Sequence, residues 1–292
     1  MDRLRIGDVT VTRVVEIETP TNPTWLYEEM VPEAFDPHRK WLEPHFLAEK
    51  RGLIRMAIQT FVVQSEGARI VVDTCVGNDK PRRQPFWNLL DLPFLERLRE
   101  AGHPPESVDR VLCTHLHVDH VGWNTRLVDG AWVPTFPNAR YLFGRQEWEH
   151  WRALDAGRRR GSLGDSVYPI VDRDLHELVE TDHRVTSEVW LEPSPGHTPG
   201  HVSVRIASRG EEAVITGDLM HHPVQCAHPE WAGVADSDPE RAKATRRAFL
   251  ERYGDTPVLV IGSHFATPSV GRVVRDGDAW RFDAGFRSGR EA

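Results

Sequence analysis

Cysteine is scarce in this sequence: only Cys75, Cys113 and Cys226 occur in 292 residues, and no two are spaced as CxxC. Small secreted domains rely on several disulfides, and structural zinc sites often use closely spaced cysteine pairs. An odd set of distant cysteines fits neither scheme. We therefore expect three free thiols in a reducing compartment, which indicates a cytoplasmic protein.

Long apolar runs and long basic runs are missing as well. No stretch approaches the roughly 18 apolar residues that a membrane-spanning helix needs, and the first residues lack the apolar segment of a signal peptide. The longest run of basic residues is Arg158–Arg160, and the formal net charge is −8. Since nucleic acid is bound through a basic face, neither a membrane nor nucleic acid is an expected partner. A small-molecule substrate is expected instead, and an anionic one stays possible because bound metal ions can supply positive charge.

The sequence does have an ordinary globular composition with an excess of two residue types. Hydrophobic residues make up 39% and charged residues 27%, so a hydrophobic core of domain size is available. The counts of 15 histidines and 10 tryptophans are high for this length. Tryptophan excess is typical of a bulky core or of an oligomer interface. The histidine excess matters because several of the histidines are clustered.

Alternating apolar residues predict strands in both halves of the chain. Hairpins with a glycine in each turn are predicted at 4–14, 58–73 and 270–282. Other strands are predicted at 110–114, 140–143, 189–192, 201–206, 213–216 and 258–261, and a helix at 145–155. The pattern favours an α/β protein in which two sheets pack face to face with helices outside. A single domain over 1–292 is the expected organisation.

Two further helices are predicted from the residues at their ends. Asp91 is the expected N-cap of a helix that ends at Gly102. Ser237 and Glu240 have the S-x-x-E spacing of a capping box, so a second helix is expected to begin there. Gly254 is the expected end of that helix.

A proline-rich segment at about 19–55 interrupts this pattern. Five prolines break regular structure there, and five aromatic residues alternate with them. Such a segment is too apolar for a flexible linker. We expect an arm that packs over the functional site or against a second subunit, which makes a homodimer the preferred assembly.

Four side chains of the metal-ligand type occur within six positions. His115 and His117 are two apart after an expected strand, so both project to the same side and can face one metal ion. Asp119 and His120 follow where the chain turns toward a helix, and they can face a second ion nearby. Imidazole and carboxylate suit zinc and related divalent ions. Core packing does not explain these residues, because a buried histidine or aspartate must be paired or metal-bound.

Three later segments offer further ligands at the ends of expected strands. His197 lies in a loop stiffened by glycine and proline. Asp218 follows the Thr-Gly pair that ends one strand, and His264 follows the Gly-Ser pair that ends another. The carboxylate of Asp218 can bridge two ions. The four segments together predict one dinuclear centre shared between two sheets.

In their order, the motifs HxHxDH, GHTPGH, TGD and GSH resemble those of the metallo-β-lactamase superfamily over most of the chain. The resemblance implies a four-layer αββα sandwich of two mixed sheets, with a dinuclear site at one edge. It implies two divalent ions per chain, with zinc favoured and manganese, iron or cobalt as alternatives. The implied ligands are His115, His117 and His197 for the first ion, Asp119, His120 and His264 for the second, and Asp218 between them.

Within the superfamily, the sequence is similar to the lactonase and methyl-parathion-hydrolase-like branches. Antibiotic-hydrolysing members commonly carry Cys where Asp218 stands. Homoserine lactonases often have Tyr three residues after the bridging Asp, whereas this chain has His221, as the methyl-parathion-hydrolase group does. The implied activity is hydrolysis of an ester or lactone bond by a hydroxide that bridges the ions. Asp119 would orient this hydroxide and His221 would assist the substrate.

Several alternatives stay open at this point. The same site would serve an organophosphate triester hydrolase or a thioesterase, and an iron-dependent oxidoreductase of the same fold is an alternative from a different class. His222 is an alternative to His221 as the histidine that faces the substrate. Asp73 is expected either to orient a ligating histidine or to brace a loop, while Thr198 and His201 either orient a ligand or only form a turn. Five aromatic residues are expected either to line an apolar pocket or to pack in the core or a dimer interface: Trp25, Trp41, Phe86, Trp87 and Trp231.

Overall fold

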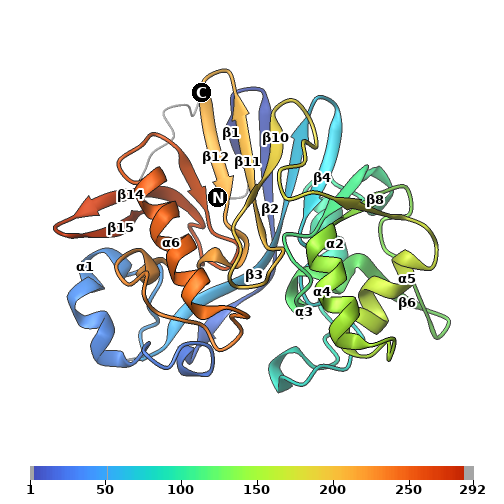
Figure 1. Ribbon diagram of the computed structural model, residues 1–292, viewed down its shortest axis with the longest axis horizontal. Coiled ribbons are helices and arrows are strands. Elements are labelled where there is room, and N and C mark those ends of the chain that lie inside the picture. The colour runs from blue at the N-terminus through green and yellow to red at the C-terminus, as the bar shows by residue number, and fades with distance from the viewer. Residues whose placement is uncertain (1–2, 51, 286–292) are drawn as a thin grey trace.

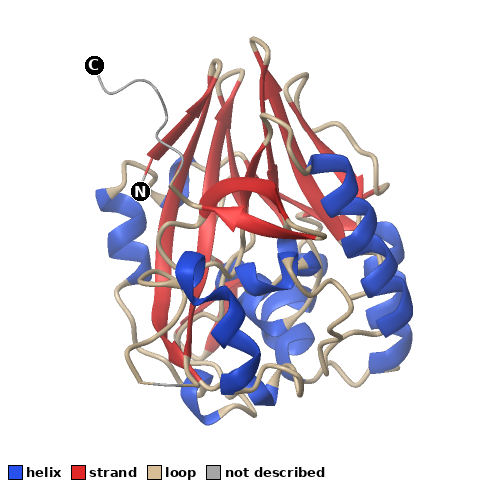
Figure 2. Ribbon diagram, turned by 90° about the vertical axis from the view of Figure 1, so that its left-hand side faces the viewer, coloured by secondary structure: helices blue, strands red, loops and turns tan. Residues whose placement is uncertain are grey.

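Two β-sheets lie face to face at the centre of the protein and helices cover their outer sides (Figure 1). The computed structural model describes residues 3–50 and 52–285, so the first two and last seven residues of the expected 1–292 domain lie outside the described part. Turned by 90°, the molecule again shows its helices outside the strands (Figure 2). The predicted sandwich of two mixed sheets flanked by helices is confirmed.

The first sheet has seven strands in the order β1-β2-β3-β4-β5-β8-β9. Its strands are β1 (Arg3–Ile6), β2 (Val9–Thr21), β3 (Ile54–Ser65), β4 (Ala68–Val72), β5 (Arg110–Leu112), β8 (Arg140–Gly144) and β9 (His176–Val179). The pairs from β1 to β4 are antiparallel, and the pairs from β4 to β9 are parallel. A separate two-stranded sheet consists of β6 (Thr125–Val128) and β7 (Ala131–Pro134).

The second sheet has six strands in the order β10-β11-β12-β13-β14-β15. Its strands are β10 (Val189–Pro193), β11 (Val202–Ser208), β12 (Glu211–Ile215), β13 (Leu259–Ile261), β14 (Val270–Asp276) and β15 (Ala279–Asp283). Only β12 and β13 pair in parallel, and the other neighbours are antiparallel. The turn of the last hairpin lies at the predicted Asp-Gly position.

Six α-helices and several shorter helical turns connect the strands. The α-helices are α1 (Arg39–Leu42), α2 (Phe94–Glu100), α3 (Val118–Val121), α4 (Arg145–Asp155), α5 (Tyr168–Val171) and α6 (Pro239–Tyr253). The 3-10 turns are η1 (Pro23–Trp25), η2 (Pro32–His38), η3 (Pro85–Trp87), η4 (Pro105–Ser107), η5 (Gly122–Asn124), η7 (Gly217–Leu219) and η8 (Pro223–Cys226), and η6 (Leu163–Val167) is a π-helix. In Figure 1, α6 lies over one sheet and α2 and α4 lie over the other.

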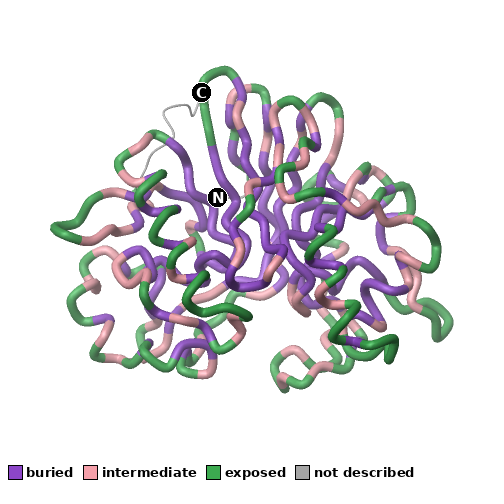
Figure 3. The backbone as a smooth tube through the Cα atoms, viewed as in Figure 1, coloured by how far each residue is buried: buried purple, intermediate pink, exposed green. Residues whose placement is uncertain are grey.

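The core consists of three apolar layers because the central strands are covered on both faces. In β4, Ile70 and Val72 pack between the two sheets, whereas Val71 packs under the helices of its own sheet. Ile215 and Val214 of β12 divide in the same way between the inner layer and the layer beneath α6. Alternate residues of a strand point to opposite faces, so a fully apolar run is needed here. Figure 3 shows the buried backbone as a continuous band through the middle of the molecule.

The proline-rich arm is shorter than predicted and packs against its own chain. β2 continues through Pro20 to Thr21, and β3 begins at Ile54, so the irregular segment is 22–53. Pro20 is accommodated because β1 pairs with β2 only as far as Thr12, which leaves one side of the later β2 residues without a ladder partner. The aromatic side chains of the arm pack into the layer beneath α6, among them Tyr27, Phe35 and Phe46.

Both helix starts predicted from capping residues are wrong. α2 begins at Phe94 with Pro93 as its N-cap, and Asp91 caps nothing in it. The residue before a proline avoids helical geometry, so the helix cannot extend back past Pro93. At α6 the N-cap is Asp238 instead of Ser237, and its carboxylate accepts a 3.1 Å hydrogen bond from the backbone of Arg241. Asp238 precedes a proline, which favours the extended backbone of an N-cap.

Candidate metal centre

Strand ends from both sheets bring the predicted ligands to one edge of the sandwich. His115 follows β5, Asp218 follows β12 and His264 follows β13, each three residues beyond the last strand residue. His197 lies in the connection between β10 and β11. The parallel pairs β4–β5 and β12–β13 end at this edge. Each of these four ligands therefore lies in the segment that follows a short apolar strand.

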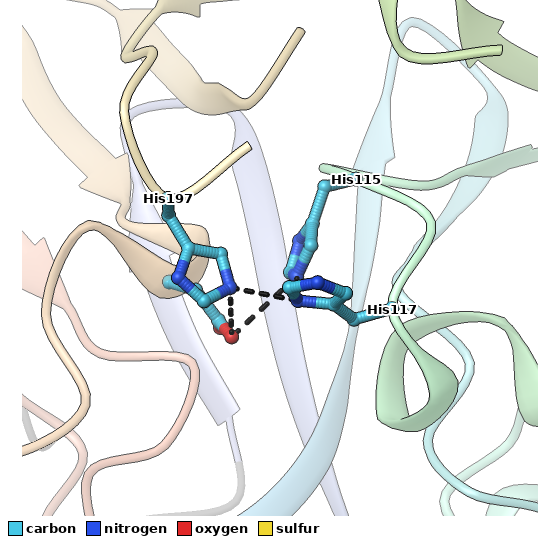
Figure 4. A group of neighbouring side chains, drawn as sticks. His115, His117 and His197 are labelled. Carbon is cyan, nitrogen blue, oxygen red and sulfur yellow. Dashed lines mark hydrogen bonds and ion pairs between the residues drawn. The ribbon is translucent and has the colours of Figure 1, made fainter. Parts of the chain in front are cut away.

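Three histidines and one carboxylate form the first group. His117 places its Nδ1 3.0 Å from Nε2 of His115 and 2.8 Å from Nε2 of His197. Oδ2 of Asp218 lies 3.5 Å from Nε2 of His115 and 3.3 Å from Nε2 of His197. The four ligand atoms lie within 4.8 Å of one another. Figure 4 shows His115, His117 and His197 directed toward one another from two sides of the site.

A second group lies on the other side of the same carboxylate. It contains Asp119, His120 and His264, whose ligand atoms also lie within 4.8 Å of one another. Oδ1 of Asp218 is 3.1 Å from Nε2 of His120 and 3.0 Å from Nε2 of His264. Each oxygen of Asp218 thus faces a different set of histidines. The structure brings together all seven residues that the sequence predicted.

The chemistry of this donor set fits divalent ions. Oδ1 of Asp218 is buried, and among the described residues it has no hydrogen-bond donor in good geometry. Burial lowers the pKa of His115 and His117 well below the usual value, and nearby histidines lower it further. Burial would raise the pKa of Asp218, but His120 and His264 outweigh this effect and hold it well below the usual value. His115 and His117 therefore offer neutral imidazoles beside a charged carboxylate, whereas Asp218 raises the pKa of His120, His197 and His264 against the effect of burial, so that a cation would displace protons from those three rings.

Polar partners hold the far nitrogens of His120, His197 and His264, as is usual for metal ligands. Nδ1 of His120 lies 2.9 Å from Asp73, and Nδ1 of His197 lies 2.8 Å from Asp236. Nδ1 of His264 lies 2.9 Å from the carbonyl of Ala57. Asp73 had been expected in this role. Asp236 and Ala57 had not, because neither belongs to a motif and both are far from their histidine in sequence.

One carboxylate in α4 joins the two loops that carry the first group. Glu147 accepts a 3.1 Å hydrogen bond from the backbone of Leu116 and a 3.0 Å one from the backbone of Gly200. It also accepts from the Trp151 indole, whose ring packs on His117. Glu147 is buried, so these bonds are shielded from water. No motif in the sequence points to this residue.

His221 faces the centre and His222 does not. Nε2 of His221 lies 3.1 Å from Oδ2 of Asp218, and its Nδ1 lies 2.6 Å from the hydroxyl of Tyr27 in the arm. Nε2 of His222 instead bonds the carbonyl of Phe46 at 3.0 Å. His201 also belongs to the surroundings of the site, because its Nε2 accepts a 2.8 Å hydrogen bond from the backbone of Asp218.

A cavity of about 430 Å³ opens onto both groups. His221 and five of the candidate ligands line it, and so do Arg83 and Arg82, the latter in an ion pair with Asp165. Its apolar wall is formed by Trp25, Leu26, Met56, Ile58, Trp87 and Val234. Of the five predicted aromatic residues, Trp25 and Trp87 line the cavity, and Phe86 packs against both of them. Trp41 and Trp231 pack elsewhere, in the layer beneath α6.

Sequence comparison identifies relatives of known activity. A family model described as "Metallo-beta-lactamase superfamily" matches residues 54–264. An N-acyl homoserine lactonase of Bacillus cereus is 27% identical over 175 residues, which are 56% of this chain and 63% of the relative. An N-acyl homoserine lactonase of Bacillus thuringiensis is 26% identical over 223 residues, which are 72% of this chain and 82% of the relative. The chain thus spans less than two thirds of the Bacillus cereus relative.

Structural comparison finds the same fold over nearly the whole chain. The hydrolase AbOPH, of the β-lactamase superfamily, is similar with a TM-score of 0.77 and 24% identity, covering 96% of both chains. AidC, described as a dizinc quorum-quenching lactonase in complex with a product, is similar with a TM-score of 0.77 and 20% identity, covering 96% of this chain and 95% of that one. In the described part of this chain, no helix is long and apolar enough to cross a membrane.

Proposed function

The chain belongs to the metallo-β-lactamase superfamily, and on that premise we propose that it is a dinuclear metal-dependent hydrolase that cleaves an ester or lactone bond of a small organic molecule. The single observation that carries the proposal is Asp218, which presents one oxygen to each group of histidines. Relatives named as N-acyl homoserine lactonases support this bond type. Zinc is the proposed metal, as in the similar AidC.

Under this proposal each ion is held by residues from both sheets. His115, His117, His197 and Asp218 would hold one ion, and Asp119, His120, His264 and Asp218 would hold the other. When bound, the two ions supply the positive charge that polarises a substrate carbonyl and activates water for attack. Asp119 is the most exposed carboxylate of the set and is proposed to orient that water as well.

His221 is proposed to donate a hydrogen bond to the substrate, and Tyr27 to hold it in the required tautomer. Burial raises the pKa of Tyr27, so its hydroxyl keeps its proton. When that hydroxyl donates to Nδ1 of His221, the imidazole proton must be on Nε2. Nε2 lies at the polar end of the cavity, 3.1 Å from Asp218. A substrate oxygen bound there would meet an N–H donor.

The cavity supports an apolar substituent on the substrate. Trp25 and Leu26 of the arm and Met56 and Ile58 of β3 line it. Apolar area of this kind contributes roughly 25 cal/mol per Å² that is removed from water. Arg82 is already paired with Asp165 at 2.6 Å, and Arg83 also lines the cavity.

The test is a hydrolysis panel on purified protein of known metal content. It contains aryl esters, acyl-homoserine lactones, simple lactones, aryl phosphotriesters and a thioester, each with a chelated control. We expect chelator-sensitive turnover of an ester or lactone. Turnover of phosphotriesters alone, or of the thioester alone, would overturn the proposed bond type but not the proposed metal centre. No turnover in protein that holds about two iron ions would favour the oxidoreductase alternative.

A further inference from the structure

A second pair of facing histidines lies outside the cavity, where the arm meets the body of the protein. His38 is the last residue of η2, and His228 follows η8. Their Nε2 atoms are 2.8 Å apart, and the two rings are inclined by 78°. Both side chains are half-buried, so the pair can be reached from solvent. Neither residue lines the catalytic cavity.

The spacing of this pair matches that of the nitrogens in the candidate metal centre. There, the facing nitrogens of His117 and His197 are 2.8 Å apart, and those of His120 and His264 are 3.2 Å apart. In each case two imidazole nitrogens from different segments of the chain face each other at close range. Two ligands of one ion lie about 3 Å apart when each bond is about 2.0–2.1 Å long.

The surroundings of His228 leave its Nε2 with a lone pair that can bind a metal ion. Oε1 of Glu230 lies 3.1 Å from Nδ1 of His228. A carboxylate only accepts hydrogen bonds, so Nδ1 carries the proton of the neutral ring and Nε2 keeps its lone pair. Ligating histidines commonly have such a carboxylate on the far nitrogen. Trp231 stacks on His228 at 4.1 Å and fixes the plane of the ring.

We propose that His38 and His228 bind a divalent transition-metal ion through their Nε2 atoms, at a site separate from the dinuclear centre. Water completes the coordination, because both side chains are partly exposed. Asp276 acts on His38 electrostatically and adds negative charge beside the site. Imidazole ligands suit zinc, nickel and copper. When no ion is bound, Nε2 of His38 carries a proton and donates a hydrogen bond to Nε2 of His228.

The ion would fasten the arm to the segment after η8. His38 belongs to the same arm that carries Trp25 and Tyr27 to the catalytic cavity. His228 precedes Trp231, whose carbonyl accepts a hydrogen bond from Arg246 of α6 at 2.6 Å. A bond from His38 through the ion to His228 therefore ties the arm to an element that is already anchored. The site stands on its own geometry and does not depend on the proposed reaction.

The probe is nickel binding to protein that holds two zinc ions per chain, as measured before nickel is added, so that the dinuclear centre is filled and the His38–His228 site is free. After equilibration with Ni²⁺ and gel filtration, we expect about one nickel ion more per chain in the wild type than in His38→Ala or His228→Ala. His45→Ala removes an exposed histidine of the same arm and should leave nickel uptake unchanged. Glu230→Gln keeps both ligands but weakens the orientation of His228, so nickel affinity should fall by about 10–100-fold.

Thermal unfolding separates loss of the site from loss of the fold. Nickel should raise the Tm of the wild type and of His45→Ala, but not that of His38→Ala, and circular dichroism should show that all three are folded. Equal nickel uptake in the wild type and both histidine variants would overturn the proposal, as would no uptake by the wild type. If the dinuclear centre itself were wrong, zinc content would be low while the nickel difference persisted.

Discussion

At the scale of single residues, Asp218 connects the two halves of the candidate centre. Its carboxylate lies within 3.5 Å of nitrogens from His115, His120, His197 and His264. Each of its oxygens faces histidines from a different group, so no neighbouring residue can replace it. The loss of this one side chain should affect both proposed ions together.

Asp218→Ala should lose metal along with activity. The substitution removes the carboxylate that lies between the two groups, so each proposed ion would lose a ligand. Metal content, measured by plasma mass spectrometry, should fall from about two ions per chain to below one, and turnover should be lost with it. Glu251→Ala changes an exposed carboxylate of α6 and serves as the control. Full activity in Asp218→Ala would contradict the proposed centre.

His221→Ala should keep the metal and lose turnover. A positioned proton donor contributes about 10²–10⁴-fold to rate, so kcat should fall within that range. Tyr27→Phe keeps the aromatic ring but removes the hydroxyl that bonds His221, and a single hydrogen bond suggests a roughly tenfold smaller kcat. The readouts are steady-state kinetics and metal content. Unchanged kcat in His221→Ala would rule out its role toward the substrate.

At the scale of elements, α4 connects two loops that come from different sheets. Glu147 holds the backbone of Leu116 beside one pair of histidines and the backbone of Gly200 near His197. Gly200 lies so close that a Cβ there would be 2.4 Å from the backbone nitrogen of Glu147. The spacing between the loops is therefore set by the helix, and the geometry of the first group depends on it.

Glu147→Ala should weaken metal binding while leaving every ligand in place. Removal of a group that orients ligands typically costs 10–100-fold in metal affinity, and we expect a loss in that range. Competition with a chromophoric chelator would measure it. Glu149→Ala removes an exposed carboxylate two residues along the same helix and should bind metal like the wild type. Equal affinities in both variants would show that α4 does not position the loops.

At the scale of the whole molecule, the site lies where the two sheets meet. Its seven candidate ligands come from the segments after β5, β10, β12 and β13, which belong to both sheets, and two of them, Asp119 and His120, lie in α3. Ions bound there would connect the two halves of the sandwich. The metal should therefore contribute to the stability of the entire fold as well as to catalysis.

Removal of metal should lower the Tm of the wild type. Ions bound only by the folded state stabilise it by about 2.7 kcal/mol when their free concentration is a hundred times Kd. Differential scanning fluorimetry with and without chelator should show a single transition that moves to lower temperature. Asp218→Ala should unfold at the same temperature in both conditions. A chelator-induced shift of equal size in that variant would mean that the stabilising ion is held elsewhere.

The homodimer stays a prediction at this scale. The arm buries Tyr27 and Phe35 within its own chain, so it does not need a second subunit to cover them. Phe86, Leu89 and Val234 are exposed apolar residues that could form an interface between two copies. Light scattering should give twice the chain mass of 33.3 kDa if the prediction holds. The chain mass itself would overturn it.

The fold class and the candidate ligands could be predicted from the order of residues alone. Strand periodicity indicated the layers, and ligands such as His115, His117 and Asp218 were recognisable because each follows a strand at short range. These features depend on local spacing, which the order of residues fixes directly. The helix starts at Asp91 and Ser237 were mistaken because a proline near each one, at 93 and 239, shifted the first helical residue.

The residues that surround the ligands could not be predicted from the sequence, because they come from distant parts of the chain. Tyr27 and His221 are 194 positions apart, and Asp236 and His197 are 39 apart, yet each pair is in contact. The choice between His221 and His222 was likewise settled by a backbone carbonyl of the arm that binds His222. Such contacts arise from the packing of the arm and loops on the two sheets. Packing brings together residues without regular spacing, so no local pattern in the sequence predicts these contacts.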